Sequence, residues 1–372
     1  MDFEQLNPRL IVLLNMFGLY TNRDHKFTVS SYVVIAINIL IRGIICSLGV
    51  GMLVYHSFNL PNCFVFICMS VSCVSANVLM SHGFDVYDQM DMVIKNLSTN
   101  SISTIIRTNK RRLLFVSTTW VVQLLATSVY LYQSESTELL KLVTILEPRK
   151  SHFFYLLEVL IFWSATYSMS SFTAVSAIYN RFNIVMRFYA NDVKLALEQL
   201  QLKDKLSMVE VDQVRTLYQT LLNVKTVVNV KFGSIPLLVF ITLFDCYAIS
   251  FTYVVVEHED LSIGFRYVIF WPMCIKFGLL STMVVRESAK SMDAIRSLQK
   301  SIIDFAGVSN MAECPCVKMA KHSLYNIAAP PVDPNTASGL FEVDWNFCLT
   351  FANAVIPFTL MIITSSNKIS CN

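Results

Sequence analysis

Charged side chains are scarce in this chain: they make up 15% of its 372 residues, whereas 54% are hydrophobic and the formal net charge is +3. A soluble protein of this length needs more polar surface than this composition supplies, so one integral membrane domain is the expected class. The positive charge is small and dispersed, which excludes nucleic acid as an expected partner. The lipid bilayer is the partner that the composition indicates.

Catalytic and metal-binding patterns are also missing. The sequence has no nucleophile elbow, no phosphate-cradling glycine loop, no HExxH and no pair of carboxylates placed together on an apolar stretch, so we expect no enzyme activity. Its 6 histidines are scattered, and Cys314-Pro-Cys316 lacks the second cysteine pair of a zinc site. We therefore expect neither a metal nor a cofactor.

Seven apolar stretches are long enough, as helices, to cross a hydrocarbon core of about 30 Å. They cover residues 33–55, 61–82, 113–132, 153–179, 234–256, 263–285 and 340–363. This pattern predicts an all-α, seven-transmembrane helical membrane protein. In chain order we expect a cytosolic amino-terminal segment, six transmembrane helices with helical cytosolic extensions, a cytosolic anchor segment, a last transmembrane helix and an extracellular tail, at 1–32, 33–285, 286–339, 340–363 and 364–372.

The distribution of basic residues predicts how these helices are oriented. The amino-terminal segment and the loops after the second, fourth and sixth stretches contain 22 Lys and Arg residues, whereas the other loops and the tail contain four. By the positive-inside rule, the amino terminus lies in the cytosol and the carboxyl terminus outside. Asp2 and Glu4 argue against a cleavable signal peptide, so we expect the first apolar stretch to act as the insertion signal.

Aromatic and ionisable residues gather in the predicted outer halves of the middle helices. Around an outward-facing cavity they would suit a small organic ligand, although aromatics in these places also form interfacial belts or pack between helices. Asp245 and Lys276 lie at similar predicted depths, so an ion pair between two helices is the alternative role for that carboxylate. The candidate pocket residues are Tyr155, Glu158, Trp163, Tyr167, Asp245, Tyr253, Tyr267 and Trp271.

The last apolar stretch differs from the other six. Asn346, Thr350 and Asn353 follow one another at spacings of four and three, which places three polar side chains on one helix face. Pro357 leaves the carbonyl group of Asn353 without its helical donor. Such a stripe joins helices or lines a pore shared by several subunits. The candidate pore residues are Asn346, Thr350, Asn353, Pro357, Leu360, Ile363 and Thr364, with the last two at the outer constriction.

The segment that runs into this stretch, Ala337-Ser338-Gly339-Leu340-Phe341-Glu342-Val343-Asp344, resembles the carboxyl-terminal signature of the arthropod gustatory receptor family, which is related to insect odorant receptors. Phe17-Gly18-Leu19, Leu324 and Pro334 add to the resemblance, which extends over the whole chain. It implies a ligand-gated, nonselective cation channel of the plasma membrane that a small organic tastant opens. It also implies a homo- or heterotetramer with a central pore lined by the last helices and a base built from cytosolic helices.

One part of the family pattern is altered. The family carries Thr-Tyr, five residues and then Gln-Phe, and these positions align with Ile356-Pro357 and Ile363-Thr364 here. The glutamine near the pore constriction is therefore absent. Gating and ion selectivity are the properties that this change would affect.

Two other classes share parts of the pattern. A G-protein-coupled receptor also has seven helices, but its amino terminus is extracellular and its third helix normally ends in an Asp-Arg-Tyr-like motif. A membrane transporter would show paired interrupted helices or an internal repeat. Opposed termini and three long cytosolic stretches with helical periodicity, at 83–112, 181–233 and 286–339, favour the channel.

Overall fold

The computed structural model describes residues 3–8, 10–12, 33, 36, 40, 86–108, 118, 121, 125, 152–203, 205–256, 264–308 and 314–369. Most of the first predicted transmembrane stretch, 33–55, all of the second, 61–82, and most of the third, 113–132, therefore lie outside the described residues. The described part is mostly helical. Its elements are α1 (Phe3–Leu6), helical residues 86–95 and 99–108, α7 (His152–Gln201), α8 (Met208–Phe232), α9 (Ser234–Val256), α10 (Gly264–Gly307), α11 (Pro315–Ala328), β1 (Thr336–Ala337), β2 (Phe341–Glu342) and α12 (Trp345–Ile369).

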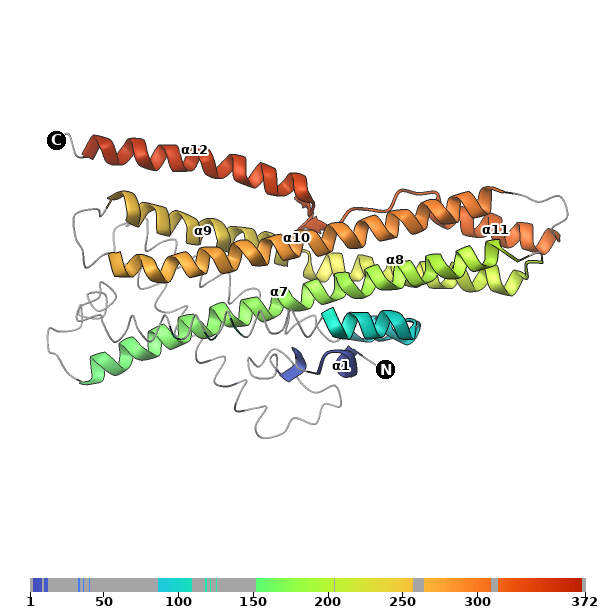
Figure 1. The fold of residues 1–372 in the computed structure, drawn as a ribbon, viewed down its shortest axis with the longest axis horizontal. Helices are drawn as coiled ribbons and strands as arrows, with labels where there is room; N and C mark the ends of the chain where they lie inside the picture. The colour runs from blue at the N-terminus through green and yellow to red at the C-terminus, as the bar shows by residue number, and fades with distance from the viewer. Residues whose placement is uncertain are drawn as a thin grey trace.

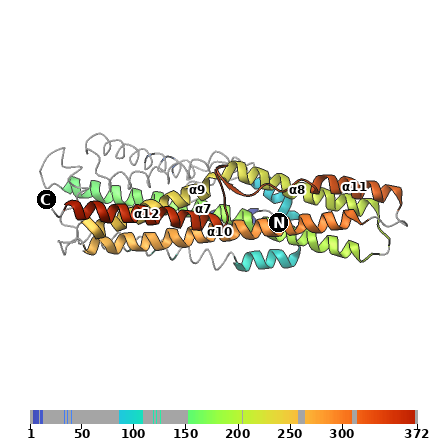
Figure 2. The ribbon, with the colours of Figure 1, turned by 90° about the horizontal axis from the view of Figure 1, so that it is seen from above.

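Two long helices organise the molecule. α7 and α10 run along most of its long axis and pack against each other (Figure 1). α8 and α11 lie beside them at one end, whereas α9 and α12 lie at the other end, where the carboxyl terminus is found (Figures 1 and 2). Both long helices continue well past the apolar stretches 153–179 and 263–285.

Local sequence explains where several of these helices begin. Ser207 and Glu210 form a capping box at the start of α8, in which the hydroxyl group of Ser207 accepts from the N–H of Val209 at 3.2 Å. Asp192, on α7, accepts from the N–H of Ser98 at 2.8 Å and so caps helix 99–108 from a neighbouring helix. These carboxyl and hydroxyl oxygens satisfy donors that a helix start otherwise leaves unpaired.

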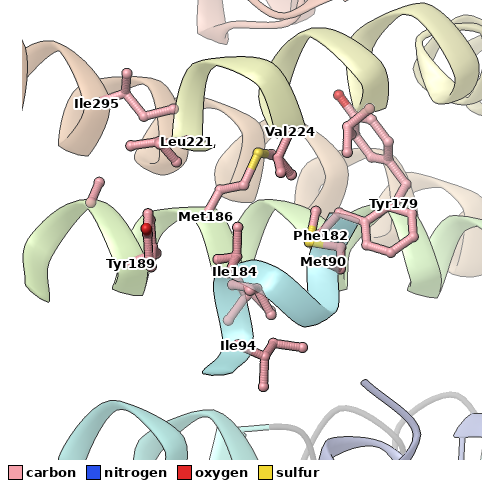
Figure 3. Close-up of a cluster of buried hydrophobic side chains, with 14 of the residues drawn as sticks. Met90, Ile94, Tyr179, Phe182, Ile184, Met186, Tyr189, Leu221, Val224 and Ile295 are labelled. Atoms are coloured by element: carbon pink, nitrogen blue, oxygen red, sulfur yellow. The ribbon is translucent and has the colours of Figure 1, made fainter. Parts of the chain in front are cut away.

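The core between these helices is apolar and closely packed. In Figure 3, Met186 of α7 lies beside Val224 of α8, while Ile94 of helix 86–95 lies below Ile184. Ile295 contributes from α10 (Figure 3). All five side chains are buried. Burying one side chain of this kind contributes about 1.5–3 kcal/mol to the stability of the folded state. These side chains therefore hold α7, α8 and α10 together at this end of the molecule.

The predicted last helix starts later than the sequence indicated. α12 begins at Trp345 rather than at residue 340, because Phe341–Glu342 pair with Thr336–Ala337 in a short antiparallel hairpin. Ser338 and Gly339 turn the chain with positive φ angles of 54° and 73°. The signature segment is therefore mostly a hairpin that precedes the helix.

One described helical stretch is long and apolar enough to cross a membrane by length and composition alone. It is Met208–Phe244, which runs through α8 into α9. α9 itself has the bounds expected for the fifth transmembrane stretch, 234–256. The seven-helix topology stays a prediction.

Candidate functional site

The predicted pocket residues belong to three helices that reach the same end of the molecule. The backbone there is the first part of α7, the second part of α9 and the start of α10 (Figure 1). These segments carry, in that order, Tyr155, Glu158, Trp163 and Tyr167; Asp245 and Tyr253; and Tyr267 and Trp271. Their side chains lie outside the described residues, so the pocket itself stays a prediction.

The start of α12 is fixed by a cap and by aromatic packing. The carboxylate of Asp344 accepts from the N–H of Phe347 at 2.9 Å, which satisfies one of the free donors at the helix start. The rings of Phe347 and Phe351 pack edge-on against Phe240 of α9, with centroid distances of 4.5 and 5.1 Å. Edge-to-face pairs of this kind add about 0.5–1.5 kcal/mol beyond area burial. One face of α12 is thereby attached to α9.

The opposite side of α12 carries the predicted pore residues. Asn346, Thr350, Asn353, Pro357 and Leu360 are all exposed. Thr350 donates to the carbonyl of Asn346 at 3.0 Å, and Asn346 donates to Asp344 at 3.1 Å. The side chains of the two remaining candidates, Ile363 and Thr364, lie outside the described residues. The polar stripe therefore faces away from the helix bundle in a single chain.

The hairpin before α12 is seated on the junction between α8 and α9. The N–H of Ser338 donates to the carbonyl of Gly233 at 2.9 Å, and the N–H of Thr336 donates to the side chain of Asn229 at 2.9 Å. A Cβ atom on Gly233 would lie 3.0 Å from the carbonyl oxygen of Thr336 and 2.3 Å from that of Asn229. Glycine is required there because both neighbours are backbone atoms that cannot easily move.

A buried polar cluster beside the hairpin was not anticipated from the sequence. Asn335 comes from the linker before α12, and its side chain donates hydrogen bonds to Asn183 of α7 and to Ser288 of α10. All three are buried. The signal in the sequence was weak: Asn180 and Asn183 are polar residues within a mostly apolar segment of α7, and asparagines more often lie at a surface.

The two cysteines of the Cys-Pro-Cys motif are exposed at the start of α11. A hydrogen bond from the thiol of Cys316 lowers the pKa of the Cys314 thiol and raises that of Cys316. Among the described residues, no group of three or more His, Cys, Asp or Glu side chains is placed to hold a metal ion.

No family model matches the chain, and no curated protein matches its sequence. Among solved structures, it is similar to the insect olfactory receptor OR5 from Machilis hrabei, with a TM-score of 0.72, 11% identity and coverage of 97% of this chain and 98% of that chain. The chain has the fold of this insect olfactory receptor.

The structure of the same receptor in complex with eugenol gives a TM-score of 0.58 at 10% identity, again over 97% of this chain and 98% of that chain. At such low identity the likeness concerns the fold. The mostly helical fold agrees with the helical class that the sequence predicted.

Proposed function

We propose that the chain is a chemosensory receptor subunit of the gustatory type that forms a ligand-gated, nonselective cation channel in the plasma membrane. The observation that carries this proposal is the exposed stripe on α12: Asn346, Thr350 and Asn353 face away from the bundle while Phe347 and Phe351 attach the helix to α9. A polar helix face in a membrane needs water or polar partners. A pore shared by several copies supplies both.

In a symmetric assembly, one such stripe in each subunit is enough to line a pore. When identical subunits assemble around a central axis, each contributes the same helix face, so a single stripe becomes a ring of amides and hydroxyls. The apolar side chain of Leu360 lies further along this face and would form a ring that closes the channel by excluding water. A homo- or heterotetramer, as the family resemblance implies, is the assembly that we propose.

The ligand that we propose is a small organic tastant bound among the outer parts of α7, α9 and α10. The predicted residues there combine aromatic rings with two carboxylates, Glu158 and Asp245, which suits a ligand with an apolar body and a few polar groups. A similar fold with eugenol bound is known for the Machilis hrabei receptor, which supports this ligand class. No cofactor, metal or nucleic acid enters the proposal.

Whole-cell recording tests this function. Cells that express the chain should show a current on application of eugenol or another member of a panel of small phenols, sugars and bitter alkaloids. The current should reverse close to 0 mV with sodium outside and potassium inside, as expected of a nonselective cation pore. A response that requires G proteins and persists without any membrane conductance would instead identify a coupled receptor.

A further inference from the structure

The linker between α11 and α12 is held against neighbouring helices at several points. Gln299 of α10 donates to the carbonyl of Pro330 at 2.6 Å, and the ammonium group of Lys225 of α8 donates to the carbonyl of Asp333. Lys225 is only 4% exposed, so this contact is made away from water. Backbone groups in a proline-rich segment have no helical partners, and these side chains satisfy them instead.

Asn335 occupies the centre of this attachment. Its amide nitrogen donates to the side-chain oxygen of Asn183 at 3.2 Å and to the hydroxyl oxygen of Ser288 at 3.0 Å. The side-chain nitrogen of Asn183 donates to the backbone carbonyl of Tyr179 at 3.0 Å. Asn335 is 4% exposed, and Asn183 and Ser288 are fully buried. Leaving hydrogen bonds unmade in such a buried setting costs free energy. We therefore expect the linker to move together with α7 and α10.

The two helices joined at this point are also the two that carry predicted pocket residues. Tyr167 and Asn183 lie on α7 at a separation of about 24 Å, and Trp271 and Ser288 lie on α10 at a separation of about 26 Å, at 1.5 Å per residue. Continuous helices transmit displacements over such lengths because their backbone hydrogen bonds resist bending. A movement of α7 relative to α10 at the pocket end would therefore act on the bonds of Asn335.

Asn335 is also directly connected to the start of the last helix. The N–H of Val343 donates to the carbonyl of Asn335 at 2.8 Å, which closes the hairpin next to the polar cluster. Asp344 follows and caps α12. A displacement of Asn335 thus reaches the first turn of α12 through one short, hydrogen-bonded hairpin.

Resting on the proposed function, we propose that Asn335 is a positioning residue that couples the relative position of α7 and α10 to the orientation of the pore helix α12. Asn183 and Ser288 are its two partners in this role. Ligand-driven movement at the outer ends of α7 and α10 changes the geometry at Asn335, and the hairpin transmits that change to α12.

Two serines on α10 provide a matched test. Ser288→Ala removes a hydroxyl group that binds Asn335, whereas Ser291→Ala removes an equally buried hydroxyl group that has no hydrogen-bond partner among the described residues. The parent and the two variants are purified as full-length chains in detergent and compared by hydrogen–deuterium exchange. In Ser288→Ala the amides of Ser338, Val343 and Phe347 should exchange about fivefold faster, the factor that corresponds to one net hydrogen bond. Ser291→Ala should leave them unchanged.

Recording of currents then separates coupling from simple structural support. In Ser288→Ala, the ratio of the current evoked by eugenol to the current without ligand should fall about fivefold, while cell-surface labelling stays at the parent level. Asn335→Asp should lower the ratio further, because a carboxylate of the same shape cannot donate to Asn183 or Ser288. Ser291→Ala should keep the parent ratio.

Equal exchange at the three amides in both serine variants, or an unchanged current ratio in Ser288→Ala, would overturn the coupling role. A uniform rise of exchange over the whole chain, with α11 included, would do so as well, since it would show general loosening. If parent and variants pass no current while Ser288→Ala still loosens the hairpin, the channel function is wrong and the linkage between Asn335 and α12 stands.

Discussion

Arg187 and Glu287 form an ion pair of 3.0 Å that joins α7 to α10, and the carboxylate of Glu287 is only 1% exposed. The pair lies one helical turn from Asn183 on α7 and next to Ser288 on α10. A buried carboxylate of this kind depends on its partner, because an unpaired charge in an apolar setting is strongly unfavourable. The crossing of the two long helices is thus fixed by a charge pair beside the polar cluster.

Arg187→Met should destabilise the protein by about 3 kcal/mol, since it leaves the carboxylate of Glu287 buried without this cation. Thermal unfolding in detergent, followed by size-exclusion chromatography with fluorescence detection, measures the change. Lys203→Met breaks the exposed pair with Glu210 and serves as the control, with an expected loss below about 1 kcal/mol. Equal losses in the two variants would show that burial of the pair does not matter.

The burial of Tyr189 on α7 predicts a loss of stability at alkaline pH. Burial raises the pKa of Tyr189 to about 12, and the side chain of Asn96 partly opposes this shift. Between about pH 10 and 12 the unfolded chain therefore loses this proton first, so stability falls as pH rises. Tyr189→Phe should make the thermal midpoint less dependent on pH in this window. Tyr325→Phe, at an exposed tyrosine, should keep the parent slope, and a parent slope in Tyr189→Phe would contradict the prediction.

The ligand pocket is tested by aromatic truncation. Trp163→Ala, Tyr253→Ala and Trp271→Ala should each shift an agonist dose–response about tenfold to higher concentration, because a buried aromatic contact is worth about 1–2 kcal/mol in binding. Surface labelling must match the parent. Tyr325→Ala, on the distant α11, should leave the midpoint unchanged. Parent-like responses in all three pocket variants would place the ligand elsewhere.

The pore assignment predicts opposite effects of polarity along α12. Leu360→Ser and Ile363→Ser should raise the current without ligand several-fold, because a polar ring holds water that an apolar ring excludes. Asn353→Leu should reduce conductance. Cysteines placed at 346, 350, 353, 357 and 360, with Cys348 replaced, should be blocked by water-soluble thiol reagents. Cysteines at 347 and 351, on the face that packs against α9, should be insensitive, and insensitivity at all seven positions with normal current would exclude this helix from the pore.

Topology distinguishes the channel from a G-protein-coupled receptor. Because 22 Lys and Arg residues lie on one predicted side and four on the other, an antibody should detect a carboxyl-terminal tag on intact cells. An amino-terminal tag should stain only after permeabilisation. Staining of the amino-terminal tag on intact cells would rule out the proposed orientation. Tags at both ends of the same chain provide the internal control.

The sequence alone predicted the features that depend on local geometry. The fifth apolar stretch, 234–256, has the bounds of α9, because the length of an apolar run directly sets the length of the helix it can form. The end of α11 at Ala328 also has a local cause, because the three closely spaced prolines that follow cannot continue a helix. Asn346, Thr350 and Asn353 share one exposed face because spacings of four and three repeat the helical period.

Only the tertiary structure decided how the linker is attached. Asn335 bonds Asn183 across 152 residues and Ser288 across 47, and no local pattern in the chain relates these three positions. The late start of α12 was likewise missed, because the apolar residues Leu340 and Phe341 suited a helix as well as a hairpin. Helix propensity acts between near neighbours, whereas the partners of a buried amide depend on how distant helices pack.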